Sequence, residues 1–236
     1  MEKTKRLYVY VYVYGGPEEM SRRAAETFAE TAERKIRAKG SFNVALSGGK
    51  TPERLYALLG AEYSEKIEWG KVHIFWGDER CVPPDSPESN YRMASKALLS
   101  RVDIPDKNVH RIRGEDEPMS AALAYEEEVR SHFGLKAGEA PVFDMVLLGL
   151  GRDGHTLSIF PATKALFEEE RLVIDNYVEK LKAHRVTMTL KAVNNASNAL
   201  FLVSGKEKAV ILREVLKGTE AIYPAQMVRP GKLLWL

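Results

Sequence analysis

The sequence contains a single cysteine, Cys81, and no apolar run long enough to cross a bilayer. One cysteine excludes an intrachain disulfide and fits the reducing environment of the cytosol. The longest apolar run, residues 145–151, is far shorter than the roughly 18 residues that a membrane span needs. Residues 7–14 are too few and too rich in tyrosine for the core of a secretory signal. We therefore expect a cytoplasmic protein that does not enter a membrane.

The sequence also has little excess of one charge over the other, because 35 basic and 33 acidic residues leave a formal net charge of +2. So small an excess does not indicate a nucleic-acid-binding surface, and we expect no nucleic acid as a partner. It leaves room for a basic pocket that takes a phosphorylated metabolite. Internal repeats and low-complexity linkers are also absent from the 236 residues. We expect a single domain over residues 1–236, a monomer or homodimer whose core needs no disulfide or metal to fold.

Strand-like apolar runs alternate with helical patterns along the chain. Strands are expected at residues 7–14, 42–47, 71–76, 108–113, 142–151, 185–190, 199–205 and 232–236. Helices are expected at 17–39, 51–59, 90–102, 119–133 and 206–217. This alternation predicts an α/β fold, a doubly wound, mainly parallel sheet with helices on both faces. Ligands of such sheets bind beyond the carboxyl ends of the strands, so the polar residues that follow each strand are the candidate site.

The strand at 42–47 is followed by Ser47-Gly48-Gly49 and a helix. Glycines let the backbone approach a ligand, and the amides that open a helix favour an anion, so this loop predicts a phosphate cradle. It is also what a tight strand-to-helix turn needs. The loop does not match the nucleotide-binding P-loop motif, because residue 44 is valine where that motif has its first glycine. The loop also resembles a nucleophile elbow, which keeps Ser47 open as the nucleophile of a serine hydrolase.

Two other strand ends carry charge. Asp78, Glu79 and Arg80 follow the strand at 71–76, and the planar fork of an arginine suits a phosphate or carboxylate. After the strand at 199–204, Lys206 or Lys208 lies near the start of a helix, where a cation opposes the helix dipole unless an anion binds there. The alternative for both groups is a solvated surface position.

The most distinctive strand end is the glycine-rich loop after residues 142–151. Its glycines fit a dinucleotide-binding fingerprint. That motif requires a long helix directly after the loop, and Pro161 prevents such a helix. The loop places Asp153 and His155 at the carboxyl edge of the sheet, and histidine suits general-base chemistry near neutral pH. We expect no metal here, because neither histidine nor cysteine recurs at ligand spacing around His155.

Four motifs, taken in order and spacing, resemble the 6-phosphogluconolactonases of the glucosamine-6-phosphate isomerase/6-phosphogluconolactonase family. They are LSGGKTP, GDERCVPPDSPESNYRMA, FDMVLLGLGRDGHTLSIFP and RVTMTLKAVNNASNALFLVSGKEKAVIL, which together with their spacing extend over roughly four fifths of the chain. The first 40 residues carry no family motif, and the chain ends without the short Asp-containing tail of many members.

The resemblance implies hydrolysis of 6-phospho-D-glucono-1,5-lactone to 6-phosphogluconate in the oxidative pentose phosphate pathway, without cofactor or metal. It implies that His155 is the base and that Asp78 and Asp153 shape the sugar pocket or orient their neighbours. It further implies that Arg80, Lys208 and the Ser47-Gly48-Gly49 loop hold the phosphate. We expect carboxylate and phosphate groups to raise the pKa of His155 in the complex.

Three alternatives stay open. A glucosamine-6-phosphate deaminase or sugar-phosphate isomerase typically has a tyrosine where this chain has Arg80 and an acidic turn after the histidine, where this chain has residues 158–161. A non-catalytic sugar-phosphate sensor needs a DNA-binding helix pair, whereas residues 1–40 predict one strand and one helix. A serine hydrolase needs Ser47 together with a late histidine such as His184.

Overall fold

A seven-stranded parallel sheet forms the centre of the protein, for which the computed structural model describes residues 8–218 and 221–236. Every neighbouring pair of its strands is parallel. In spatial order the strands are β1 (Tyr8–Val11), β10 (Lys232–Trp235), β9 (Asn198–Leu202), β6 (Met145–Gly149), β2 (Phe42–Leu46), β3 (Val72–Trp76) and β5 (Val109–His110). The predicted doubly wound α/β fold is confirmed.

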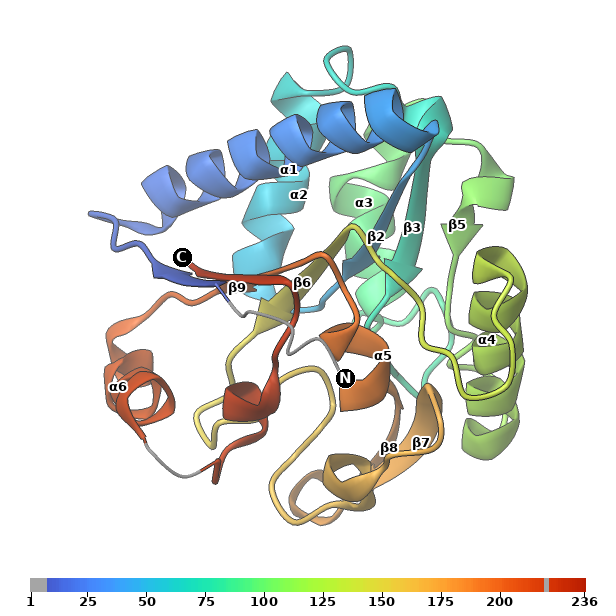
Figure 1. The fold of residues 1–236 in the computed structure, drawn as a ribbon, viewed down its shortest axis with the longest axis vertical. Coiled ribbons are helices and arrows are strands. Elements are labelled where there is room, and N and C mark those ends of the chain that lie inside the picture. The colour runs from blue at the N-terminus through green and yellow to red at the C-terminus, as the bar shows by residue number, and fades with distance from the viewer. Residues whose placement is uncertain (1–7, 219–220) are drawn as a thin grey trace, which may run out of the picture.

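Helices cover both faces of this sheet. They are α1 (Pro17–Lys39), α2 (Lys50–Glu62), α3 (Asn90–Ala97), α4 (Pro118–Phe133), α5 (Leu190–Asn194) and α6 (Ala209–Lys217). Figure 1 shows α1, α2 and α3 on one side of the sheet, α5 and α6 on the other, and α4 beside β5. Within the described ranges, no helix is both long and apolar enough to span a membrane.

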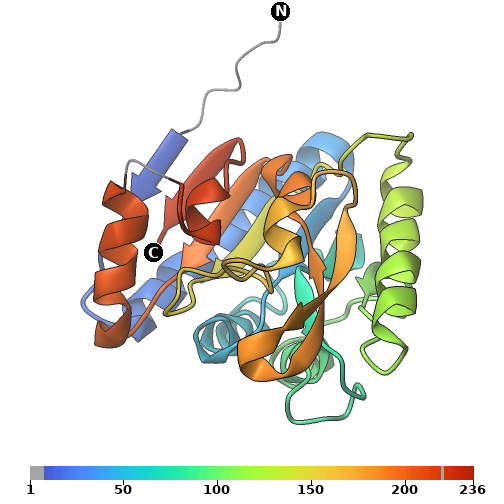
Figure 2. The same ribbon diagram turned by 90° about the horizontal axis from the view of Figure 1, so that it is seen from below.

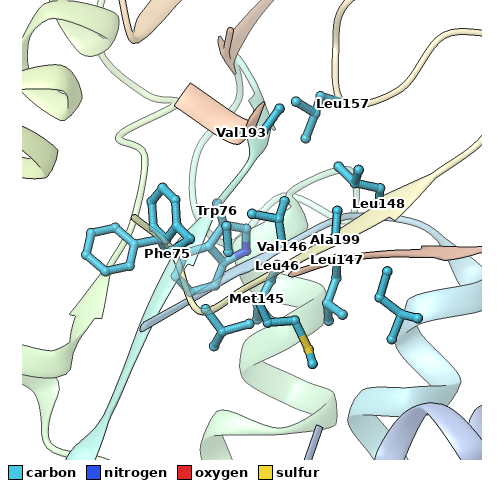
Figure 3. Close-up of a cluster of buried hydrophobic side chains, with 14 of the residues drawn as sticks. Leu46, Phe75, Trp76, Met145, Val146, Leu147, Leu148, Leu157, Val193 and Ala199 are labelled. Atoms are coloured by element: carbon cyan, nitrogen blue, oxygen red, sulfur yellow. The ribbon is translucent and has the colours of Figure 1, made fainter. Parts of the chain in front are cut away.

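The core lies where the central strands meet these helices. All five residues of β2 are buried, which explains its continuous apolar sequence, because a parallel strand is covered on both faces. Figure 3 shows side chains of β2, β3 and β6 packed together in this region, among them Leu46, Phe75 and Leu147. The buried apolar side chains form one cluster. That continuity is compatible with the single domain predicted for residues 1–236, which stays a prediction.

A second, three-stranded antiparallel sheet is the main feature that the sequence did not predict. It pairs β4 (Asp78–Arg80) with β8 (Ala183–Met188) and β8 with β7 (Val173–Val178). The proline- and aspartate-rich sequence after residue 76 predicts a long loop, but residues 78–80 form β4 and the irregular segment begins only at Cys81. Strand β4 is only three residues long and wholly polar, so no pattern of apolar residues marks it. Figure 2 shows the β7–β8 hairpin crossing in front of the parallel sheet.

The helix after Ser47-Gly48-Gly49 differs from its predicted bounds at both ends. Thr51 is typical of a helix cap and Gly60 of a helix end, but neither has that role here. The helix begins at Lys50 with Gly49 as the residue before it, and it continues through Gly60 to Glu62. A Cβ at Gly60 would lie 3.0 Å from the backbone oxygen of Ala97. The glycine therefore allows α2 to approach α3 closely, and it does not end the helix.

Other predicted bounds were too long. The strand expected at 108–113 is reduced to Val109–His110, and the helix expected to extend to residue 102 ends at Ala97. Short 3-10 turns account for several remaining segments: Trp69–Lys71, Leu99–Arg101, Asp106–Asn108, Lys164–Phe167, Glu179–Leu181, Lys206–Lys208 and Pro224–Met227. Ser89 is the N-cap of α3, and its side chain accepts a hydrogen bond from the backbone amide of Arg92.

Candidate active site

The loop that follows β6 folds tightly around the side chain of His155. The backbone amide of Gly151 donates to the carbonyl oxygen of His155 at 2.8 Å, and that of Gly154 donates to Gly151 at 3.1 Å. A Cβ at Gly151 would lie 2.0 Å from His155 Nδ1. Gly154 has a φ of 77°, which glycine adopts without strain. The glycines of this motif therefore serve to hold the imidazole against its own loop.

Asp153 fixes the orientation of that imidazole. Its Oδ1 lies 2.5 Å from His155 Nδ1 and also accepts the backbone amide of His155 at 3.3 Å. The other carboxylate oxygen is paired with the ammonium group of Lys180. A carboxylate at Nδ1 places the proton of the neutral ring there and leaves the lone pair on Nε2. None of the described residues is hydrogen-bonded to Nε2, so that nitrogen is free to act as a base.

Burial keeps His155 unprotonated in the free protein. It lowers the pKa of the imidazole to about 4, Asp78 opposes this change, and Lys208 adds to it. The ring also stacks on Phe160, with ring centroids 4.0 Å apart. At neutral pH the imidazole is therefore neutral, which is the state that a general base needs. The expectation of a raised pKa concerned the complex with a bound phosphate, and it stays a prediction.

His155 lines a pocket of about 530 Å³ that is rich in cations. Five basic side chains share its wall: Arg80, Arg152, Lys180, Arg185 and Lys208. Within residues 8–218 and 221–236, Asp153 is the one acidic side chain that lines it, and Asp153 is already paired with Lys180. Such an excess of positive charge attracts an anionic ligand.

Two of these cations lie side by side on neighbouring strands of the second sheet. Arg80 of β4 lies directly opposite Arg185 of β8 in the antiparallel register. Burial lowers the pKa of Arg185, and the charge of Arg80 lowers it further. Like charges at opposed positions destabilise a strand pair, so an anion bound between the two guanidinium groups would relieve this repulsion. Sequence reasoning missed Arg185 because the hairpin that carries it to Arg80 was not predicted.

Lys206 and Lys208 differ in exposure and in position. Lys206 is exposed, whereas Lys208 is half-buried and lines the pocket. Burial lowers the pKa of Lys208, and the neighbouring charge of Arg152 acts in the same direction. Arg152 and Lys208 are thus a second pair of cations in one pocket, on loops that follow β6 and β9.

Asp78 and Glu79 lie beneath the pocket. Asp78 is buried and accepts a hydrogen bond of 2.6 Å from the hydroxyl of Ser158. The carboxylate of Glu79 accepts bonds from three backbone amides, those of residues 80, 90 and 91, and from the Ser89 hydroxyl. Burial raises the pKa of Glu79, and these hydrogen bonds oppose the change. Glu79 therefore ties β4, the strand that carries Arg80, to the start of α3, and Asp78 acts on His155 through its charge.

The Ser47-Gly48-Gly49 loop borders a neighbouring hollow of about 520 Å³. Gly49, with a φ of 108°, lines that hollow together with Arg80, which is the residue that both spaces share. A Cβ at Gly48 would lie 1.8 Å from the side-chain oxygen of Asn90, so Gly48 is needed for this close packing. The structure therefore brings the glycine loop beside the His155 pocket but not into its wall.

The arrangement for a serine hydrolase is not formed. The Ser47 hydroxyl is buried and makes no hydrogen bond among the described residues. His184 lies on the β7–β8 hairpin, where its ring is 4.9 Å from that of Tyr177 and its Nδ1 is 3.9 Å from a carboxylate oxygen of Asp175. Neither group therefore supplies the nucleophile and base that this alternative requires.

A carboxylate-oriented histidine beside paired cations, at the carboxyl edge of a doubly wound sheet, defines an enzyme that applies base chemistry to a small anionic substrate. The family model described as glucosamine-6-phosphate isomerases/6-phosphogluconolactonase matches residues 15–235. The chain belongs to this family.

Similar proteins carry one of the two names in that description. The 6-phosphogluconolactonase of Nostoc sp. is 42% identical over 205 residues, which cover 85% of this chain and 83% of the relative. The crystal structure of the 6-phosphogluconolactonase from Thermotoga maritima matches with a TM-score of 0.83 at 34% identity, covering 98% of each chain. The 6-phosphogluconolactonase from Trypanosoma brucei matches with a TM-score of 0.84 at 31% identity, covering 99% of this chain and 96% of that one.

Proposed function

We propose that this protein hydrolyses 6-phospho-D-glucono-1,5-lactone to 6-phosphogluconate, a step of the oxidative pentose phosphate pathway. Relatives and solved structures that carry the name 6-phosphogluconolactonase, each matched over most of its length, support this reaction. The observation that carries the proposal is His155, whose Nδ1 is held 2.5 Å from Asp153 in a pocket lined by five cations.

His155 acts as the general base. A water molecule attacks the lactone carbonyl carbon and gives its proton to His155 Nε2, while the carbonyl π electrons move onto the oxygen. The tetrahedral intermediate then reforms the carbonyl and breaks the bond to the ring oxygen, which takes the proton back from Nε2. The acid that results loses a proton to solvent. Asp153 stabilises the imidazolium that exists between the two proton transfers.

The phosphate is bound by Arg80 and Lys208, to which we add Arg185 because it lies opposite Arg80. The guanidinium groups offer paired donors to phosphate oxygens. From the Ser47-Gly48-Gly49 loop, Gly48 and Gly49 contribute backbone amides at the border of the pocket, whereas the amide of Ser47 is donated to the hydroxyl of Tyr56 at 3.0 Å. Asp78 positions the loop after β6 through Ser158. Binding the phosphate at this end fixes the carbonyl against the base, which removes the entropy cost of finding it.

The energetic demand on these residues is modest. General-base catalysis contributes about 10²–10⁴-fold, or roughly 3–5 kcal/mol of barrier. The side chains of the pocket supply a base and cations, so the reaction needs no cofactor or metal. An isomerase or deaminase needs a second acid or base, and among the described residues the only carboxylate in the pocket wall is tied to Lys180. The lactonase reaction therefore fits this pocket better.

We also propose that the protein works in the cytoplasm as a monomer or homodimer, on a small phosphorylated lactone and without nucleic acid or membrane as partner. A single cysteine and a net charge of +2 support this setting.

The test is a lactonase assay on freshly made 6-phosphogluconolactone, with the unphosphorylated lactone as the control substrate. Rates are corrected for spontaneous hydrolysis at each pH. We expect kcat/KM for the phosphorylated lactone to exceed that for the control by at least about tenfold, because each charge-assisted hydrogen bond contributes about 1.5–3 kcal/mol. Equal values for the two lactones would overturn the proposal.

A further inference from the structure

Three histidines lie together at the β5 edge of the parallel sheet, outside the His155 pocket. His73 comes from β3, His110 from β5, and His132 from the last turn of α4. Their ring centroids are 4.6 to 5.4 Å apart. One ring nitrogen of each lies within 4.8 Å of those of the other two. None of the three lines the pocket that contains His155, so the reaction leaves them without a role.

The hydrogen bonds of the cluster orient two of the imidazoles from outside. His110 Nδ1 lies 2.8 Å from a carboxylate oxygen of Glu128, and His132 Nε2 lies 2.9 Å from the side-chain oxygen of Asn43. Both partners are acceptors, so each of these nitrogens carries the proton. The lone pairs then lie on His110 Nε2 and His132 Nδ1. A histidine that donates one N–H to a carboxylate or amide oxygen is the usual form of a metal ligand.

The spacing of the nitrogens also suits a metal. His73 Nδ1 is 3.1 Å from His110 Nε2. Two nitrogens bound to one tetrahedral zinc ion at about 2.0–2.1 Å lie about 3.4 Å apart. A cation could therefore replace the proton that now joins these two rings, after His73 moves its own proton from Nδ1 to Nε2. The exchange adds no proton and releases none.

We propose that His73 Nδ1, His110 Nε2 and His132 Nδ1 bind one zinc ion or another late first-row divalent cation. Imidazole is a preferred ligand of these ions. Glu128 and Asn43 orient the ligands, and water completes the tetrahedron. The site joins the edge strand β5 to α4 and β3, so its effect is on stability and not on the lactonase reaction.

The charges around the cluster allow this. Burial lowers the pKa of His73, and it lowers that of His132 to about 4, so both rings are already unprotonated at neutral pH. Lys39 and Lys107 are the nearby cations. Lys39 is paired with Asp144 at 2.8 Å, and Glu128 brings a negative charge to the site itself.

The experiment uses untagged full-length protein, stripped of metal by dialysis against a chelator and then titrated with Zn²⁺ or Co²⁺. We expect one equivalent to bind, with the visible spectrum of tetrahedral Co²⁺ coordination. A hundredfold excess over Kd should raise Tm by about 5–10 °C, because the ion binds only the folded state. Removing and restoring metal should leave kcat unchanged. If the stripped protein shows neither the Co²⁺ spectrum nor a rise in Tm after metal is added, the proposal is overturned.

Variants separate this site from other histidines. His132→Gln should lose the equivalent, and Glu128→Gln should weaken binding by about 10–100-fold, because it acts through His110. His184→Gln, which removes a half-exposed histidine from the β7–β8 hairpin, is the matched control and should bind like the wild type. If His132→Gln folds poorly, the Glu128→Gln variant still decides, because Glu128 is 43% exposed and its loss spares the core. Equal binding by Glu128→Gln and wild type, or loss of binding in His184→Gln, contradicts the assignment.

Discussion

The pKa values of His155 and His132 are both well below the ordinary value of histidine, and the same cause lowers both. Burial is the first cause at each site, and each pKa falls to about 4. Their neighbours differ. His155 is bonded through Nδ1 to Asp153 and lines a pocket with five cations, whereas His132 lies against two other imidazoles and the ring of Phe75. Burial alone therefore does not make a base; an oriented lone pair beside a binding pocket does.

The largest effect should come from removing the base. His155→Asn preserves the size and much of the hydrogen bonding but cannot accept the proton, so kcat should fall by about 10²–10⁴-fold. Binding of the product sugar acid, measured by calorimetry, should persist. His132→Asn is the matched control at the other site and should keep its kcat. A fully active His155→Asn protein would move catalysis to another group such as Asp78.

Asp153 should matter less than His155 but more than an ordinary ion-paired aspartate. Asp153→Asn lets the ring take the wrong tautomer, so kcat should fall by about 10–10³-fold while KM changes little. Asp175→Asn also loses a lysine partner, at 2.9 Å, but lies outside the pocket wall, and it should retain kcat. Steady-state kinetics of the two variants decide the point. Similar losses in both would show that the effect is structural.

Removing a phosphate ligand should change capture of the substrate more than turnover. Arg80→Ala and Lys208→Ala should each raise KM for the phosphorylated lactone by roughly 10–150-fold, which corresponds to about 1.5–3 kcal/mol. The same variants should behave like the wild type on the unphosphorylated lactone. Lys206→Ala, which removes an exposed lysine from the same turn, is the control. An equal rise in KM for the phosphorylated and the unphosphorylated lactone would contradict a role of that residue in phosphate binding.

The smallest change is expected from pH. His155 must be neutral to accept a proton, so kcat/KM falls as pH decreases through its pKa of about 4 and is constant above it. Between about pH 5.5 and 8, values corrected for spontaneous hydrolysis should therefore vary little. Substrate phosphate favours the charged ring, so kcat should show its acid limb at a higher pH than kcat/KM. An acid limb of kcat/KM centred near the ordinary value would contradict the effect of burial.

The sequence was most informative where one strand end carries its own chemistry. Asp153 and His155 follow a buried apolar strand and are two residues apart, so their contact could be predicted from local pattern alone. The sequence could narrow the phosphate-binding lysine only to Lys206 or Lys208, because the tertiary fold decides which of the two is half-buried. The fold also brings the charge of Arg152, from another loop, close enough to Lys208 to lower its pKa. Arg185 could not be predicted as a pocket residue. Its position opposite Arg80 depends on a strand of three polar residues that has no apolar periodicity.

The histidine cluster was equally invisible in the sequence. His73 and His110 are 37 residues apart, far beyond the spacing of a local metal motif, and only the sheet brings them together. The expectation that no metal binds was argued from the spacing around His155 and does not reach this edge of the sheet. Gly60 shows the reverse case. A glycine at this position predicts the end of the helix, whereas in the structure α2 continues through it and Gly60 allows close packing on α3.

The tautomer and charge of His155 are the central claim, and nuclear magnetic resonance of its ring nitrogens measures both directly. Long-range proton–nitrogen correlation spectra of the wild type, assigned with His155→Asn, give the protonation state of each nitrogen across a pH titration. We expect a neutral ring at pH 7 that is protonated at Nδ1, as the contact with Asp153 requires. We expect its pKa to lie well below 6.5, as burial requires. A ring protonated at Nε2, or a pKa above 6.5 in the free protein, would contradict the account.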